Sequence, residues 1–189
     1  MKKLMNVITM LVVIMLIFFI SGHRFTALSA AKSNSSLSKD AELLGEYEIG
    51  SSVIFLFKSD KEQLYRTVLT QKSGVLFRSN ASTYFPYSTD KLQTVGGMSF
   101  TSENTEFSFL SITSNDEDVA YIEAGVVPNV ERKEINKDEQ ISFLFPFSMQ
   151  IDFLHPTAYD KDGNKLYYYG YPKGSNVLKK EDFKWHKVE

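Results

Sequence analysis

The chain has 189 residues, of which 21 are basic and 23 acidic, and it contains no cysteine. Residues 1–30 hold three of the basic residues and no acidic one, which leaves 18 basic and 23 acidic residues, a net charge of −5. That balance offers no basic surface for nucleic acid and does not draw the chain to an anionic lipid surface. The lack of cysteine excludes disulfides and a lipoprotein anchor, which is attached at a cysteine.

The first 30 residues have the plan of an export signal. Two lysines open the chain, residues 4–20 are almost entirely apolar, and small residues follow at 27–31. No acidic residue precedes Asp40, so the two lysines favour a cytoplasmic N-terminus. We therefore predict that residues 1–30 are a signal anchor or signal peptide and that the remainder lies outside the cytoplasm.

Retention of this segment is favoured over its removal. The 17 residues from 4 to 20 reach about 26 Å as a helix, slightly less than a hydrocarbon core of about 30 Å. Ser21, Gly22 and a snorkelling Arg24 close that gap. Cleavage after Ser29 or Ala31 is the alternative. We expect a single-pass protein of the cell membrane with its domain outside, or else a secreted protein.

Residues 31–45 are predicted to be a flexible tether. Residues 32–39 (Lys-Ser-Asn-Ser-Ser-Leu-Ser-Lys) are polar and offer nothing to bury. Asp40 as a cap and Gly45 as a stop allow one helical turn between them.

Strand patterns begin at residue 47. Residues 53–57 (Val-Ile-Phe-Leu-Phe) form a continuous apolar run typical of a central strand that is buried on both faces. Polar connections join this run to residues 64–70 and then to residues 75–78, which predicts a three-stranded antiparallel meander. Residues 84–91 are predicted to be a loop.

The middle of the chain continues this pattern. Residues 106–113 are predicted to be a strand, and its apolar parity changes between Phe109 and Leu110, which indicates a bulge. Residues 115–118 are a turn that leads to a strand at residues 119–124.

The last third adds an alternating strand and a hairpin. Apolar residues alternate at Ile141, Phe143, Phe145 and Phe147, and Ile151 and Phe153 are expected to resume that pattern. Residues 160–164 (Asp-Lys-Asp-Gly-Asn) are typical of a hairpin turn leading into residues 166–171.

These elements predict a mainly β fold. Short strands at turn spacing, with 15 Phe and 10 Tyr, indicate an antiparallel β-sandwich or barrel-like domain behind an N-terminal transmembrane or signal helix. We assign residues 46–189 to one extracytoplasmic domain, because no linker separates its halves.

No metal site or cofactor is predicted. Asp160, Asp162 and Asn164 resemble a calcium loop only in their oxygen ligands, since the glycine and the glutamate that an EF-hand requires are misplaced. Zinc is disfavoured by the lack of cysteine and of paired histidines. His155 is expected to be a structural residue, partly buried at a strand end.

Catalytic motifs are equally weak. Ser88–x–x–Lys91, Ser102–x–Asn104 and Lys72-Ser73-Gly74 occur in the wrong order and spacing for the penicillin-binding class. A hydrolase would have to use carboxylates that form no recognised motif, and Asp152, Asp160 and Asp162 are the first candidates.

Aromatic residues are the remaining candidates for binding. Tyr167, Tyr169 and Tyr171 share one face of the last predicted strand, where they could stack on sugars or peptides. The competing interpretation is that they pack in the core.

Two stretches, residues 125–135 and residues 156–167, resemble a pattern in small exported proteins of Bacillus-like bacteria. In that pattern a Gly-Val segment (Gly125-Val126) leads to a charged strand, and an Ala-Tyr-Asp-x-x-Gly-Asn hairpin (residues 158–164) closes the domain. The resemblance implies an exported location and a β fold, and it implies no catalytic residue.

The sequence therefore favours a membrane-tethered, extracytoplasmic binding module at the cell envelope, and we do not expect an enzyme. Its partners would be the membrane, through the N-terminal helix, and an envelope protein or wall polymer. A cell-wall or extracellular hydrolase is the rival hypothesis, and a structural or secretion-chaperone role is the third.

Overall fold

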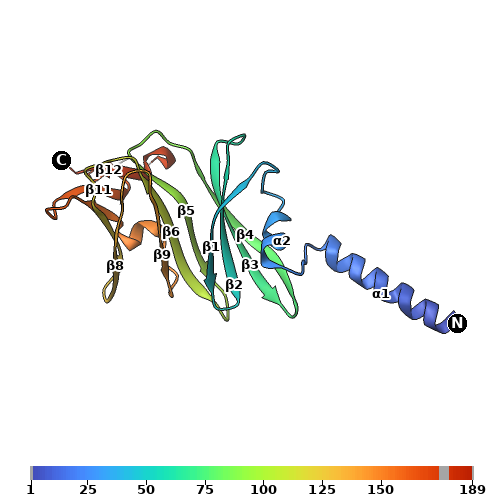
Figure 1. Ribbon diagram of the computed structural model, residues 1–189. Helices are drawn as coiled ribbons and strands as arrows, with labels where there is room; N and C mark the ends of the chain where they lie inside the picture. Colours follow the sequence, from blue (N-terminus) through green and yellow to red (C-terminus); the bar gives the residue numbers. More distant parts are fainter. Residues whose placement is uncertain (1, 175–178, 189) are drawn as a thin grey trace. The chain divides into compact units, whose positions relative to one another are not determined.

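The computed structural model describes residues 2–174 and 179–188, and it is mainly β with antiparallel sheets behind an N-terminal apolar helix (Figure 1). It confirms the predicted β class. The chain divides into two compact units, Met1–Glu62 with Thr67–Ser82, and Gln63–Arg66 with Thr83–Glu189. The expected single domain over 46–189 thus contributes to both units, and its residues 175–178 and 189 lie outside the described residues.

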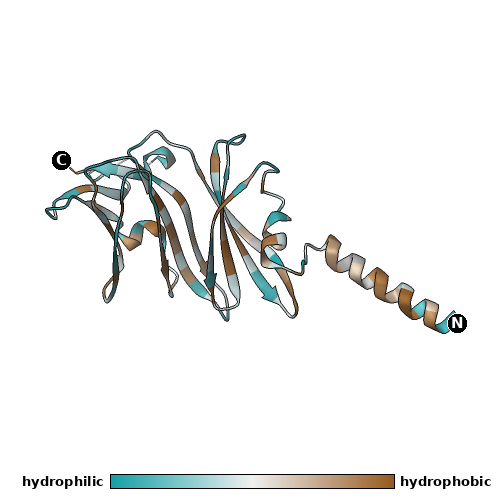
Figure 2. Ribbon diagram, in the orientation of Figure 1, coloured by the Kyte–Doolittle hydropathy of each residue, from teal (hydrophilic) through white to brown (hydrophobic). Residues whose placement is uncertain are grey.

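The first unit begins with helix α1 (Lys2–Ile20), which is apolar along almost its whole length (Figure 2). It extends away from the strands of its own unit, and Ile20 at its end is 86% exposed. A helix that is apolar on all sides is normally either buried in a protein core or inserted in a membrane. By length and composition α1 is able to cross a membrane, and an N-terminal signal sequence has the same properties.

Residues 31–45 differ from the flexible tether that their composition predicts. Helix α2 (Ala27–Lys32) begins at Thr26, whose hydroxyl accepts a hydrogen bond from the Ser29 amide. Ala30 and Ala31 are fully buried. Ala31 packs with Phe55, Phe57 and other apolar residues of the strands that follow, and Leu37 packs against the same cluster.

Asp40 ties the end of this segment to the sheet. Its carboxylate accepts hydrogen bonds from the hydroxyls of Ser38 and Ser59 and from the Lys61 amide. The bond from Ser38, followed by that from the Lys61 amide, lowers the pKa of Asp40 to about 2. The predicted helical turn over residues 40–45 is wrong, because strand β1 (Glu42–Ile49) begins there.

The four-stranded sheet has the order β1-β2-β3-β4. Strand β2 (Ser52–Ser59) lies inside it and is buried on both faces, as its apolar run predicts. Strands β3 (Leu64–Ser73) and β4 (Leu76–Pro86) complete the predicted meander. The predicted loop at 84–91 begins later than expected, because β4 continues to Pro86.

A short bridge joins the end of α1 to this sheet. Arg24 and Phe77 exchange two main-chain hydrogen bonds, of 2.8 Å and 2.7 Å, as an isolated antiparallel bridge. The chain therefore meets the sheet four residues after the apolar helix, well before the expected tether begins.

The second unit contains a three-stranded sheet of order β5-β6-β9. Strands β5 (Leu92–Thr101), β6 (Glu106–Ser114) and β9 (Gln140–Phe145) are antiparallel. The predicted bulge between Phe109 and Leu110 is wrong: pairing is continuous there, and β6 is apolar on both parities because both of its faces are buried. The predicted alternation along β9 is confirmed.

The five-stranded sheet has the order β12-β11-β10-β7-β8. Its members are β7 (Tyr121–Val126), β8 (Asn129–Glu134), β10 (Thr157–Tyr159), β11 (Lys165–Gly170) and β12 (Lys184–Lys187). The hairpin between β10 and β11 confirms the turn predicted at residues 160–164. Among the described strands, neither this sheet nor the three-stranded one closes into a barrel, and residues of both form one apolar core.

Two local predictions near this sheet are wrong. Ile151 and Phe153 belong to a 3-10 helix, η1 (Ile151–Leu154), and not to a strand. His155 is exposed and has a left-handed φ of 49°, so it ends that helix instead of being partly buried at a strand end. A second 3-10 helix, η2 (Lys180–Asp182), precedes β12.

Candidate functional site

The register of the five-stranded sheet separates its two faces, because directly opposed residues of antiparallel strands lie on the same face. The inner face faces the core and carries Ile122, Ala124, Ala158, Tyr167, Tyr169 and Trp185. The opposite surface, which we call the outer face, carries Tyr121, Glu123, Arg132, Thr157, Tyr159, Tyr168 and His186.

Two of the three candidate tyrosines belong to the core. Tyr169 packs its ring against Phe183 and Trp185, and its burial raises its pKa to about 12. Tyr167 is buried beside Asp116. Tyr171 lies just beyond β11, remains 38% exposed and packs against Phe183. The structure therefore places Tyr167 and Tyr169 where no external ligand stacks on them.

Tyr167 is part of a buried polar group. Its hydroxyl donates to the Asp116 carboxylate at 2.7 Å, and the Lys91 ammonium lies 3.1 Å from the same oxygen. Burial opposes ionisation of Asp116, but the hydrogen bonds from Tyr167, the Asp118 amide and Lys91 outweigh it and lower its pKa. Burial, and then the bond to Asp116, raises the pKa of Tyr167 to about 12. The hydrogen bonds of Asp116 with Tyr167 and Lys91 therefore serve to stabilise the core.

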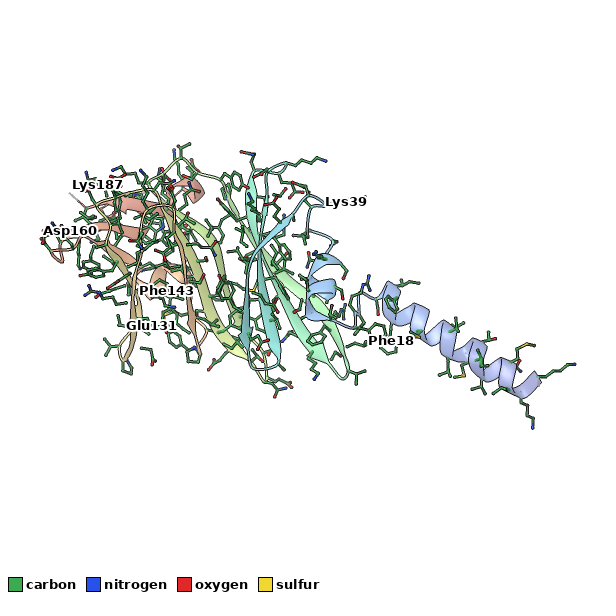
Figure 3. The ribbon with its side chains drawn as sticks, in the orientation of Figure 1. Phe18, Lys39, Glu131, Phe143, Asp160 and Lys187 are labelled. Atoms are coloured by element: carbon green, nitrogen blue, oxygen red, sulfur yellow. The ribbon has the colours of Figure 1, made fainter. Side chains whose placement is uncertain are left out.

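Asp160 holds the hairpin turn together. Its carboxylate accepts hydrogen bonds from the amides of Asp162 and Asn164 and from the Asn164 side chain. The bond from the Asn164 side chain is the main reason that its pKa is lowered. Figure 3 shows Asp160 in the turn between β10 and β11. Asp162 lies in the same exposed turn and Asp152 lies in η1, so the three carboxylates proposed for a hydrolase come from two separate segments.

The outer face carries a stack of three side chains from three neighbouring strands. The rings of Tyr121 and Tyr159 lie 4.9 Å apart and nearly parallel, at 8°. The Arg132 guanidinium carbon lies 3.4 Å from the centre of the Tyr121 ring. A guanidinium over a tyrosine ring is attracted by the ring's quadrupole. The stack fixes the direction of Arg132 even though this residue is exposed.

Glu123 adds a carboxylate beside the stack. Burial, together with the charge and the hydrogen bond of Glu123, raises the pKa of Tyr159. The hydroxyl of Tyr159 is therefore directed toward Glu123.

A cavity of about 570 Å³ adjoins this stack. Its walls include the buried apolar side chains Val119 and Ile135. Its charged and aromatic lining residues are Glu117, Tyr121, Arg132, Glu134, Lys137 and Lys161. The volume lies within the range of ligand sites in proteins, which is roughly 300–1,000 Å³.

The charges around the cavity are only partly paired with one another. Lys137 and Glu117 form an ion pair at 2.6 Å; the hydrogen bond between them lowers the pKa of Glu117 and raises that of Lys137. Within the described part of the chain, Arg132, Glu134 and Lys161 have no ion-pair partner. Two cations and one carboxylate are thus available to a ligand that enters the cavity.

The β12 end of the outer face is occupied by its own side chains. The rings of Tyr168 and His186 stack at 5.4 Å, and the Lys173 ammonium lies 4.8 Å from the centre of the Tyr168 ring. The cavity side of the face therefore offers the better binding surface. Across the described residues, no group of three His, Cys, Asp or Glu side chains is placed to hold a metal ion.

The sequence patterns missed the outer face because they selected the odd-numbered tyrosines of β11, and the side chains of Tyr167 and Tyr169 point to the inner face. Tyr167, Tyr169 and Tyr171 were the visible aromatic set, whereas the outer face uses Tyr159, Tyr168 and residues from other strands. A usable signal was present: residues 131–134 (Glu-Arg-Lys-Glu) are all charged, which is typical of a strand exposed to solvent.

Comparisons with protein-family models, with characterised proteins and with solved structures found no match to this chain.

Proposed function

We propose that the chain is a membrane-tethered, extracytoplasmic binding module of the cell envelope, and that the cavity beside Tyr121 receives its ligand. The supporting observation is the mixed lining of the cavity. Arg132 lies over the Tyr121 ring, Lys161 and Glu134 do not form an ion pair with each other, and part of the wall is apolar. A peptide complements this lining, because it supplies carboxylate, amine and apolar groups together. An envelope protein or the peptide part of a wall polymer would carry such a segment.

The export helix supports the location. Cleavage after Ser29 or Ala31 would remove Arg24, and with it the bridge to Phe77. Cleavage after Ala31 would also remove Ala30, which is fully buried. We therefore propose that α1 is retained as a single-pass anchor with both β units outside, as the resemblance to small exported proteins also suggests. Secretion after cleavage is the alternative.

For the second unit we propose a sandwich rather than a barrel. Its support is the shared core, to which the five-stranded sheet contributes Trp185 and Tyr169 and the three-stranded sheet contributes Phe143 and Phe145. Packed inner faces with separate edges are the mark of a sandwich.

The hydrolase hypothesis has weaker support. The Asp160 carboxylate already accepts three hydrogen bonds within its own turn. A general acid or base must reach the substrate's proton, and Asp160 would first have to give up the bonds that shape the hairpin.

The test is capture by the full-length chain, kept in its membrane or in detergent. Wild-type protein, Arg132→Ala and the matched control Arg78→Ala would be incubated with envelope extract, with intact cell wall and with wall whose peptides have been removed. We expect wild type and Arg78→Ala to capture one peptide-bearing fraction, and Arg132→Ala to capture it roughly tenfold less. Equal capture by Arg132→Ala, or hydrolysis of wall without capture, would overturn the proposal.

Fractionation tests the anchor. We expect the full-length chain to sediment with membranes. A shorter, soluble form in the medium as the sole product would show that the segment is cleaved.

A further inference from the structure

A second cavity, of about 550 Å³, lies in the first unit where the apolar helix ends. Its lining combines the end of α1 at Ile20 and the two residues after it (Ser21 and Gly22), the segment after α2, and strand β4. The segment after α2 contributes residues 33–36, and β4 contributes Arg78, Ser79, Ala81 and Ser82. Three parts of the chain that are distant in sequence thus surround one space.

The lining is rich in donors and lacks carboxylates. The described lining residues include six serines, one asparagine and one arginine, and no acidic residue. Arg78 is exposed, and no hydrogen bond or ion pair of its guanidinium occurs in the described part of the structure. Ser79 accepts a hydrogen bond from Asn34 at 2.8 Å and keeps its own hydroxyl hydrogen for another acceptor. A group that only accepts hydrogen bonds and carries negative charge fits this lining.

Hydrogen bonds at the end of α1 weaken its repulsion of such a group. The carbonyls at a helix C-terminus carry partial negative charge, but those of Phe18 and Phe19 already accept hydrogen bonds. The Arg24 guanidinium donates to the Phe19 carbonyl at 2.7 Å, and the Gly22 and His23 amides donate to the carbonyls of Phe19 and Phe18.

The position of the cavity identifies the source of the anion. If α1 spans the bilayer, the residues directly after Ile20 lie in the headgroup layer, because the polar layers add roughly 5–8 Å on each side of the hydrocarbon core. Phe25 is 59% exposed and its ring contacts Phe19 of α1, so it adds an apolar side chain that can enter the boundary between headgroups and acyl chains.

We infer that this cavity binds the phosphate headgroup of an anionic phospholipid of the outer leaflet, with Arg78 as the charged ligand and the surrounding serines as donors. The residues beyond residue 30 carry a net charge of −5, but the potential inside the cavity depends mainly on its own lining, which has no carboxylate. The chain does not need an attractive net charge to reach the membrane, because α1 attaches it there. The inference rests on the membrane anchor of the proposed function. It is independent of the cavity beside Tyr121.

The test uses the full-length chain in nanodiscs of phosphatidylcholine with a minority of phosphatidylglycerol. The lipids that stay bound after release of the protein are counted by native mass spectrometry. We expect wild-type chain to retain phosphatidylglycerol over phosphatidylcholine, and Arg78→Ala to reduce that enrichment roughly tenfold, since one charge-assisted contact is removed. Arg78→Lys should give an intermediate value, because it keeps the charge and loses the planar fork.

Arg132→Ala is the control, because it removes the same charge from the second unit and should leave the lipid enrichment unchanged. Inorganic phosphate is the second arm. Loss of bound phosphatidylglycerol on addition of phosphate at comparable concentration would show a general phosphate site and overturn the lipid assignment. Equal enrichment in wild type and in a folded Arg78→Ala, or none in either, would overturn the inference. Sedimentation of the full-length chain with membranes tests the anchor separately, and so distinguishes failure of the lipid site from failure of the proposed anchor.

Discussion

The hydroxyl of Tyr167 donates a 2.7 Å hydrogen bond to the carboxylate of Asp116, 51 residues earlier in the chain. Asp116 is only 5% exposed, and its second side-chain partner is Lys91. A buried carboxylate is tolerated only when its oxygens are hydrogen-bonded. This pair therefore joins the turn before β7 to the inner face of β11, and it explains why an aromatic residue that looks available for binding is part of the core.

Removing the phenol hydroxyl should destabilise the protein. Tyr167→Phe leaves a buried carboxylate with one partner fewer, and we expect a loss of about 1.5–3 kcal/mol in the free energy of unfolding. Urea unfolding of the variant measures this loss. Tyr171→Phe, at a more exposed tyrosine of the same unit, should stay within about 0.5 kcal/mol of wild type. Equal effects of the two changes would contradict the role of the pair.

The Asp116 carboxylate should contribute to stability only above acid pH. Its pKa is lower in the folded chain than in the unfolded one, so its contribution is complete above the unfolded value of 3.8 and is lost as the pH falls through the folded pKa. The difference in unfolding free energy between wild type and Asp116→Asn should therefore shrink below about pH 4. A difference that stays constant from pH 6 down to the acid limit of folding would count against it.

Tyr167 should act at the opposite end of the pH range. Its pKa rises from 10.0 to about 12 in the folded chain, so the neutral phenol is favoured by folding. The associated stability is complete below pH 10 and is lost as the pH rises toward 12. Wild type should lose up to about 2–3 kcal/mol relative to Tyr167→Phe over that interval. Unfolding curves of both chains at alkaline pH measure the difference.

Gly125 should not tolerate a side chain. It has a φ of +116° in β7, and a Cβ there would overlap the Asn129 carbonyl oxygen and approach the Phe145 ring to 3.0 Å. We expect Gly125→Ala to cost on the order of 3–4 kcal/mol, from backbone strain and overlap together. Gly163→Ala is the control in the same unit, because its φ of +86° gives strain without overlap. Thermal unfolding should show a clearly smaller loss for that control, on the order of 1 kcal/mol.

The packing of α2 can be tested at adjacent positions. Ala31 is fully buried against Phe55 and Phe57, whereas Lys32 is exposed. Ala31→Leu should destabilise the chain by about 1–3 kcal/mol through overpacking, and Lys32→Leu should change stability by no more than about 0.5 kcal/mol. If residues 31–45 were a free tether, both variants would unfold like wild type.

The sequence by itself determined what depends on neighbours along the chain. The 17 residues from 4 to 20, all apolar except Asn6 and Thr9, predict an apolar helix, since the two polar residues are too few to form a polar face. The order Asp-Lys-Asp-Gly-Asn places positive-φ and turn-forming residues where β10 meets β11. Alternation at Ile141, Phe143 and Phe145 identifies a strand with one buried side, because side chains of a strand point alternately to opposite faces.

Only the tertiary structure decided which parity faces the core. Tyr167 and Tyr168 differ by one position, and the sequence weighs them equally as aromatic strand residues. Pairing with β10 and β12 turns Tyr167 toward Asp116 and Tyr168 toward His186. A strand exposes either set equally well in isolation, so the choice comes from burial against a second sheet.

The same reason explains the two cavities and the ordered segment after α1. Arg132 meets Tyr121 because β8 pairs with β7, and Arg78 shares a cavity with Ser33 because the segment after α2 contacts β4. Residues 31–45 look like a tether because their few apolar side chains have no local partner, and Ala31 and Leu37 find one in strand β2. Local composition reports how much a segment has to bury, and the fold alone decides whether a surface is present to receive it.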